Sequence, residues 1–283
     1  MSRSELFDAP SVSATRGTGV GFAAAIQPVA AHTIATDTAG LVAGEAAVPS
    51  GDFALPVYSA RPDGAGPFPV VLVVSEIFGV HEHIVDVVRR FAKLGYLAIA
   101  PELFVRQGDA KAPSDVPTLF ATIISKVPDA QVFADLDACV AWAATQGGDL
   151  GRLGITGFCW GGRMTWLYSA KNASVKAGVA WYGRLVGATT ALQPASPVDV
   201  AGQLLAPVLG LYGGADTGIP LESVEKMKVA LAAGNAVSRA SQFVVYPTAQ
   251  HAFHADYRPS YDDAAAKDGW RRCLDWLRTH GVA

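Results

Sequence analysis

The residue best suited to covalent chemistry in this sequence is Cys159, within the run GFCWGG at residues 157–162. The apolar run 153–156 precedes it, and residues 163–168 follow with the pattern of a helix start. A strand that turns sharply into a helix, with small residues two positions before and after one reactive side chain, is typical of a nucleophile elbow. The pattern therefore predicts that Cys159 is a nucleophile.

Gly157 and Gly161 give this spacing a steric reason. The nucleophile of so tight a turn has a strained backbone, and a Cβ at either flanking position would collide with the neighbouring strand or helix. The turn also directs the sulfur to the positive end of the new helix, which favours a thiolate and points N–H groups at a nearby oxyanion. A cysteine between glycines also fits a packed core thiol, so the prediction requires a base and an acid elsewhere.

Both groups occur downstream. The apolar strand expected at residues 209–212 ends in glycines and Asp216, and the strand expected at 242–246 leads into a loop that carries His251. Taken singly, Asp216 is a turn residue and His251 a loop residue. Together they follow Cys159 in the order of the α/β-hydrolases, each just beyond the carboxyl end of an expected strand, where open α/β sheets hold their chemistry. We therefore predict a Cys-His-Asp triad.

With these residues in place, the sequence resembles the dienelactone hydrolase family, a branch of the α/β-hydrolases with a cysteine nucleophile. The resemblance runs from about Gly40 to the C-terminus. It rests on the elbow at 157–162 and on three further motifs, SEIFGV at 75–80, PELFVRQ at 101–107 and HAF at 251–253. It implies hydrolysis of the ester bond of a lactone or activated carboxylic ester through a thioester acyl-enzyme, without a metal or other cofactor.

The resemblance also implies roles for residues around the triad. Glu76 matches the glutamate that holds the resting thiol and helps to take its proton. The N–H groups of Ile77 and Trp160 match the donors of the oxyanion hole.

For substrate binding, the resemblance implies that Arg106 grips a substrate carboxylate and that Tyr182 and Phe78 line the pocket. The chain departs from the family four residues after the histidine, where the dienelactone enzyme has a second carboxylate-binding arginine and this chain has Ala255. Arg258 is close in sequence and is the candidate to replace it. The departure leaves the specific substrate open.

Composition limits the other classes of function. At 283 residues with 51% apolar and 17% charged residues, the chain can bury one large core in a single α/β domain. The net charge of −3 offers no basic surplus for nucleic acid, and no apolar stretch is long enough for a transmembrane helix. We expect Cys139 and Cys273 to be core residues rather than disulfide partners. The expected partner is a small-molecule lactone or ester, with the chain as a monomer or homodimer.

The first residues differ in character from the rest. We expect an extension at 1–39 and the hydrolase domain at 40–283. Residues 20–31 are apolar after Arg3 and Arg16, which resembles an export signal, although Gln27 and Pro28 interrupt the segment. The alternatives are a periplasmic protein whose residues 1–31 act as a signal peptide and a cytoplasmic one with a loosely packed extension.

The remaining pattern alternates strands with helices. A hairpin of two edge strands is expected at 42–48 and 53–60, buried strands at 69–74, 96–100 and 175–181, and helices at 83–94, 221–233 and after residue 129. This predicts an α/β fold with a mostly parallel sheet of about eight strands and helices on both faces. Residues 107–128 and 183–205 are expected to form irregular walls or a roof of the pocket.

Two alternatives compete with this hypothesis. His81, His83 and Asp86, with His251 and His254, superficially resemble a zinc site, but the spacing of the first three does not match a zinc hydrolase, and histidines at a helix entry or surface explain them better. Alternatively, the fold could have lost catalysis and serve as a binding protein. The presence of every triad member together with Glu76 favours an enzyme.

Overall fold

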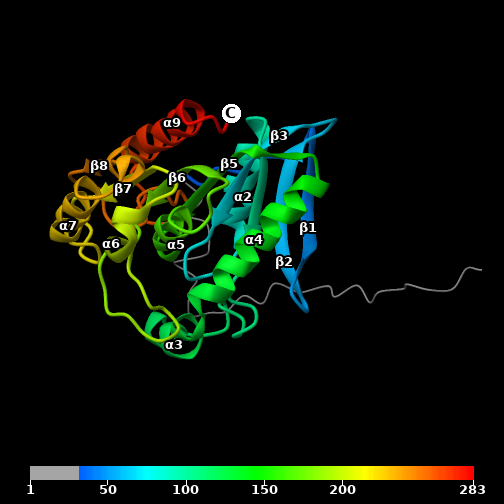
Figure 1. The fold of residues 1–283 in the computed structure, drawn as a ribbon. Coiled ribbons are helices and arrows are strands. Elements are labelled where there is room, and N and C mark those ends of the chain that lie inside the picture. Colours follow the sequence, from blue (N-terminus) through cyan, green and yellow to red (C-terminus); the bar gives the residue numbers. More distant parts are fainter. Residues whose placement is uncertain (1–31) are drawn as a thin grey trace, which may run out of the picture.

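The computed structural model describes residues 32–283, which are organised around a sheet of eight strands in the order β1-β2-β4-β3-β5-β6-β7-β8 (Figure 1). The pairs β1–β2 and β2–β4 are antiparallel, and each of the remaining pairs, from β4–β3 to β7–β8, is parallel. The strands are β1 (Leu41–Ser50), β2 (Phe53–Pro62), β3 (Phe68–Val74), β4 (Leu97–Pro101), β5 (Gly148–Phe158), β6 (Val175–Trp181), β7 (Val208–Gly213) and β8 (Gln242–Tyr246). The predicted mostly parallel sheet of an α/β fold is confirmed.

Helices cover both faces of this sheet, as the alternation of strands and helices predicts. The core on one face contains side chains of α2 and α9, and the cores on the other contain those of α4, α5 and α7. In Figure 1, α4 passes in front of the sheet. The helices are α2 (Glu82–Lys93), α3 (Val116–Thr122), α4 (Asp129–Thr145), α5 (Trp160–Ser169), α6 (Pro197–Val200), α7 (Leu221–Ala232), α8 (Ala236–Arg239) and α9 (Asp263–Thr279).

The central strand β3 shows why the sheet needs both layers. Val70, Leu72 and Val74 point into one core and Val71 and Val73 into the other, and all of them are fully buried. Because successive side chains of a strand face opposite sides, a strand covered on both faces is a continuous apolar run. Polar residues are therefore found in the loops that follow the carboxyl ends of these strands.

The structure corrects some details of the prediction. Only β1 of the hairpin is an edge strand, because β2 also pairs with β4. Residues 107–128 include the helix α3, whose Leu119 is fully buried. Residues 183–205 are largely irregular as predicted, and Gln193 donates to the carbonyls of Ile124 and Val127, so this connection packs against the segment after α3.

The segment before β1 lies against the domain. The N–H of Ile34 donates to Asp256 at 3.2 Å, and that of Thr36 donates to Asp86. The predicted export-signal segment at 20–31 lies outside the described residues, and the boundary between residues 39 and 40 remains a prediction. From residue 32 onward, no helix has the length and hydropathy that crossing a membrane requires.

Candidate active site

Cys159 lies at a sharp turn between β5 and α5 with φ 54° and ψ −112°. Its N–H donates to the carbonyl of Trp181 at 2.9 Å, which ties the turn to the end of β6. A Cβ on Gly157 would lie 2.2 Å from the carbonyl oxygen of Gly161, and one on Gly161 would lie 2.2 Å from that of Val74. Both distances are too short for any side chain, so the steric reason predicted for the two glycines is confirmed.

Asp216 and His251 meet beyond the ends of β7 and β8. Asp216 Oδ2 lies 2.7 Å from His251 Nδ1, and the carboxyl is buried. Asp216 Oδ1 accepts from the N–H groups of Gly218 at 2.8 Å and Ile219 at 3.1 Å. Burial would raise the pKa of this carboxyl, but the hydrogen bonds and the charge of His251 lower it. Asp216 is therefore fixed as a carboxylate that orients the imidazole.

His251 connects the carboxylate to the sulfur. Burial would lower its pKa, but the charge of Cys159 and the hydrogen bonds with Asp216 and Cys159 raise it to about 10. The ring also packs edge-on against Tyr182, with centroids 5.2 Å apart. The imidazole can therefore hold a proton beside the sulfur, and the sequence-predicted residues Cys159, Asp216 and His251 are brought together.

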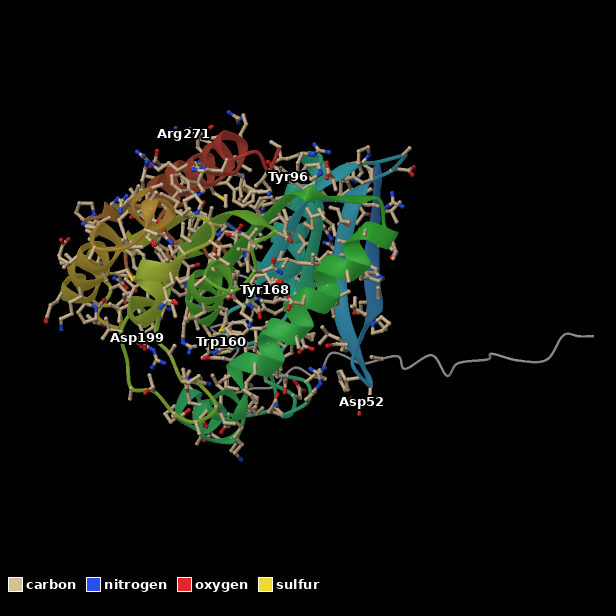
Figure 2. The ribbon with its side chains drawn as sticks, viewed as in Figure 1. Asp52, Tyr96, Trp160, Tyr168, Asp199 and Arg271 are labelled. Atoms are coloured by element: carbon tan, nitrogen blue, oxygen red, sulfur yellow. The ribbon has the colours of Figure 1, made fainter. Side chains whose placement is uncertain are left out.

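Two backbone N–H groups flank the elbow. Trp160 is the first residue of α5, so its N–H has no acceptor within the helix, and Figure 2 labels its side chain at this end of α5. Ile77 follows the end of β3 and is 6% exposed. Neither N–H donates a hydrogen bond to a residue from 32 to 283. They are available to an oxyanion beside Cys159.

Glu76 is buried next to these donors. Its Oε2 lies 3.1 Å from Nε2 of His81, and its Oε1 has no hydrogen-bond partner among the described residues. Burial would raise the pKa of the carboxyl, but the hydrogen bond from His81 and the charges of His81, His83 and Arg258 lower it to about 2. No hydrogen bond joins Glu76 to Cys159 within residues 32–283. In this state the carboxylate is bound to His81.

The arginines singled out from the sequence have different surroundings. Arg106 contacts the buried carboxylate of Asp135 through two nitrogens, with Nη2 2.8 Å from Oδ1, and its guanidinium lies 4.2 Å from the ring centroid of Phe53. Arg258 lies over Phe78, 5.4 Å from the ring centroid, and its charge acts on Glu76. Arg258 is therefore close to the reacting groups, whereas the charge of Arg106 is already balanced by Asp135.

Tyr182 and Phe78 are buried beside the triad. Tyr182 has φ 40°, and its hydroxyl has no partner among the described residues. Burial, followed by the charge of Glu76, holds its pKa well above the usual value. Tyr182 therefore presents an un-ionised hydroxyl. Ala255, at the position of the family's second arginine, is fully buried.

Sequence reasoning missed Arg184 as a residue of the site. It follows directly on the Trp181-Tyr182-Gly183 segment, and no hydrogen bond or ion pair joins it to a described residue. Its side chain is exposed, yet desolvation by nearby groups and then the charge of Arg163 lower its pKa, while the charge of Cys159 opposes this shift. The signal available in the sequence was a positive side chain two positions after Tyr182.

His81, His83 and His254 are buried rather than at the surface, contrary to one part of the prediction. His81 and His83 are at the entry to α2, as predicted, but are 6% and 5% exposed. His83 Nδ1 lies 2.9 Å from Oδ1 of Asp256, while Arg90 contacts both Asp256 and Asp86. Among residues 32–283 no group of three or more side chains is arranged to hold a metal ion.

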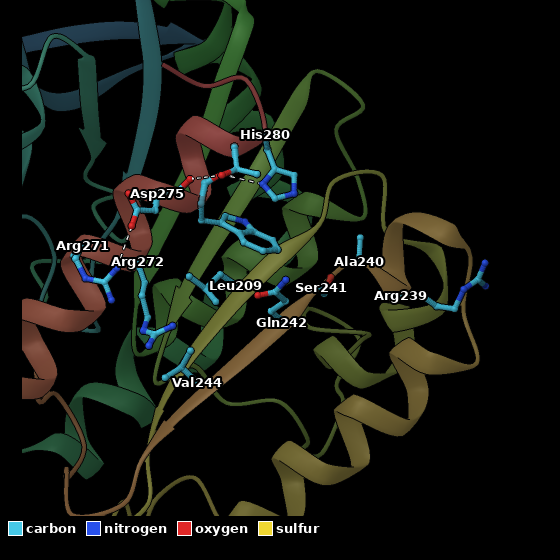
Figure 3. Close-up of a pocket in the computed structure, with 12 residues that line it drawn as sticks. Leu209, Arg239, Ala240, Ser241, Gln242, Val244, Arg271, Arg272, Asp275 and His280 are labelled. Atoms are coloured by element: carbon cyan, nitrogen blue, oxygen red, sulfur yellow. Dashed lines mark hydrogen bonds and ion pairs between the residues drawn. The ribbon is translucent and has the colours of Figure 1, made fainter.

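A cavity of about 580 Å³ lies between α9, α8 and the start of β8 (Figure 3). Its lining includes Leu209 and Gln242, from the amino ends of β7 and β8. The triad lies beyond the carboxyl ends of the strands. The cavity is therefore separate from the candidate triad.

The chain matches known proteins along most of its length. The model of the dienelactone hydrolase family matches residues 55–281. A protein of Methylorubrum extorquens named "Putative carboxymethylenebutenolidase" is 61% identical over 93% of this chain and 90% of its own length. One of the same name from Escherichia coli K12 is 55% identical over 92% of this chain and 96% of its own length.

A solved structure supports the same assignment. The crystal structure of a protein from Klebsiella pneumoniae, described as a "Putative Dienelactone Hydrolase", has 58% sequence identity and a TM-score of 0.82, over 84% of this chain and 98% of the other. The region matched by the family model includes β3 to β8, the elbow and the loops that carry Asp216 and His251. The chain therefore belongs to the dienelactone hydrolase family of α/β-hydrolases and is an enzyme that hydrolyses esters or lactones.

Proposed function

We propose that the chain cleaves a lactone or an activated carboxylic ester through a thioester on Cys159. The observation that carries the proposal is the contact of 2.7 Å between Asp216 and His251, with the imidazole beside the sulfur at the elbow. A nucleophile, a base and a group that orients the base form the minimal arrangement for covalent acyl transfer.

The steps follow from these positions. His251 takes the thiol proton, with Glu76 as a second acceptor, and the sulfur attacks the carbonyl carbon. The N–H groups of Ile77 and Trp160 stabilise the oxyanion. The C–O bond then breaks, and the leaving oxygen takes the proton from His251. Finally His251 removes a proton from water, which attacks the thioester and releases the acid and the thiol.

The nucleophile also limits the substrate. A thiolate is a good leaving group, so the tetrahedral intermediate loses sulfur again unless the substrate oxygen leaves at least as easily. Enol-lactones and activated esters leave as weakly basic oxyanions, whereas an amide nitrogen needs protonation. We therefore propose enol-lactones and activated esters as substrates rather than peptides.

A negatively charged substrate fits the cations near the site. The resemblance implies that Arg106 binds a substrate carboxylate, but its pairing with Asp135 supports a structural role. Arg258, whose charge reaches Glu76, and Arg184, whose charge interacts with Cys159, are better placed. We propose that these two arginines attract the carboxylate, while Tyr182 and Phe78 form the wall of the pocket.

The test is hydrolysis of a dienelactone and of a neutral p-nitrophenyl ester by the purified protein, each with and without iodoacetamide. Both activities should disappear on alkylation, and peptide mass analysis should find the label on Cys159. Cys139 and Cys273 are internal controls, because burial raises the pKa of both thiols. The variant Cys159→Ala should be folded and inactive.

Other outcomes would contradict the proposal in different ways. Persistent turnover by Cys159→Ala would exclude the thioester. Absence of turnover of both substrates would instead favour a scaffold that binds a small molecule without cleaving it, despite the intact triad.

A further inference from the structure

The carboxylate of Glu76 is held by a residue that the triad mechanism does not use. His81 Nε2 lies 3.1 Å from Oε2 of Glu76, and the two side chains are 4% and 1% exposed. Since an ionised carboxylate can only accept, the N–H of His81 is the donor. Glu76 directly precedes Ile77, the proposed oxyanion donor, and His81 is the N-cap residue of α2.

We propose that His81 is a positioning residue that keeps Glu76 ionised and turned so that one carboxylate oxygen remains available to the reacting groups. This inference rests on the proposed role of Glu76 as a second proton acceptor. Burial of an unpaired carboxylate is costly, and such a group takes up a proton instead. The hydrogen bond from His81 is what allows Glu76 to stay charged at so buried a position.

The arrangement of the two carboxylate oxygens supports this. Oε2 is occupied by His81, whereas Oε1 is buried and has no partner among the described residues. A buried charged oxygen without a protein partner requires an explanation, and a role in accepting a proton supplies one. With Oε2 fixed, Oε1 cannot turn to His81 and remains free to accept a proton.

The other groups that face Glu76 do not replace His81. His83 comes from α2 and is bound to Asp256, while Arg258 comes from the C-terminal loop and acts through its charge without a hydrogen bond to Glu76. Tyr182, after β6, and Tyr257 are neutral, since burial holds the pKa of each well above its usual value. Tyr257 Oη lies 3.4 Å from His81 Nε2 and braces the ring. His81 is the direct donor within this group.

The experiment compares His81→Gln, whose side-chain amide retains an N–H donor, with His81→Leu, which removes it at similar volume. Infrared difference spectra should show a protonated carboxylic acid near neutral pH in His81→Leu only, and the band should disappear in His81→Leu/Glu76→Gln. The acidic limb of the kcat/KM profile should move up by about 3–5 pH units, toward neutral, in His81→Leu and by much less in His81→Gln. Thermal unfolding of each variant verifies the fold.

The outcomes separate this inference from the proposed function. If His81→Leu leaves Glu76 ionised, or if His81→Gln behaves like His81→Leu, the positioning role is wrong. A shift of the same size in the Glu76→Gln background would also overturn it, because a merely structural effect of His81 does not require Glu76. If the wild-type protein cleaves neither substrate, the proposed function fails, while the infrared result still decides the role of His81.

Discussion

The variant Asp216→Asn tests whether the charge of this carboxylate is needed for His251 to take the proton of Cys159. Asparagine keeps an oxygen that can accept from the N–H groups of Gly218 and Ile219, so the loop should keep its shape. The asparagine side chain places its amide N–H₂ opposite His251 Nδ1, where the wild-type Oδ2 of Asp216 accepts at 2.7 Å. The imidazole then carries its proton on Nε2 and can no longer take one from Cys159.

The magnitude follows from the lost interaction. A hydrogen bond to a charged group is worth about 1.5–3 kcal/mol, which corresponds to a loss of about 10- to 150-fold in kcat/KM. The Asp216 hydrogen bond and charge are among the causes that raise the pKa of His251 to about 10, so the variant should lower it by about one to two pH units. Less imidazolium beside the sulfur means less thiolate, and alkylation by iodoacetamide near pH 7 should slow.

The assay is therefore paired. We would measure kcat/KM for a neutral p-nitrophenyl ester and the alkylation rate of Cys159 between about pH 5 and 9. Glu222→Gln is the matched control, since it also removes one carboxylate, but at the surface of α7 where it pairs with Lys226. A change of less than threefold in both rates, with folding unchanged, would refute the role of Asp216.

Three further predictions concern specificity, sterics and stability. Arg258→Gln should lower kcat/KM for a carboxylate-bearing lactone by about 10-fold or more relative to a neutral ester. Arg106→Gln should mainly lower the melting temperature, because it breaks a buried ion pair. The opposite result would restore Arg106 as the carboxylate-binding residue. Gly161→Ala should abolish activity and destabilise the protein, because its Cβ would meet a carbonyl oxygen at 2.2 Å, and a fully active variant would contradict the geometry of the elbow. Asp256→Asn should lower the free energy of unfolding by about 3–5 kcal/mol, measured by urea unfolding, because it breaks a buried pair. The pKa of Asp256 is about 2 in the folded state and 3.8 in the unfolded state, so its contribution to stability is complete above pH 3.8 and is lost as the pH falls toward 2. The variant should therefore be less sensitive to acid than the wild type, and equal acid sensitivity would contradict this contribution.

The sequence was sufficient where local sterics and chain order determine the structure. Gly157 is required by the helix that follows Cys159 and Gly161 by the end of the neighbouring strand β3. Both contacts are consequences of the tight turn, so the spacing of the glycines is visible without a structure. Asp216 and His251 could be placed because the carboxyl ends of parallel strands meet at one edge of the sheet. The strand alternation likewise predicted both helical layers.

The sequence was not sufficient where a partner comes from a distant segment. Arg106 was interpreted from its motif alone, and nothing near it in sequence indicates that Asp135, on α4, would occupy its guanidinium. The sequence offers His81 as a zinc ligand or, preferably, as a helix-entry or surface residue, and does not indicate its contact with Tyr257 from the C-terminal loop. In both cases the role of the side chain depends on a contact with a distant segment, which the periodicity of the sequence does not reveal.

Backbone strain shows how the fold supports the site. The non-glycine residues with positive φ between 32 and 283 are Cys159, Tyr182 and Ala252, and all of them lie at or beside the triad. Such conformations cost about 1–3 kcal/mol each and persist only where the surroundings determine them. The N–H of Cys159 donates to Trp181 and that of Tyr182 to Leu211, so these two strained residues are each fixed to a neighbouring parallel strand. These hydrogen bonds to the central sheet offset the strain at the elbow and at Tyr182, which explains why the two strained residues directly follow the ends of β5 and β6.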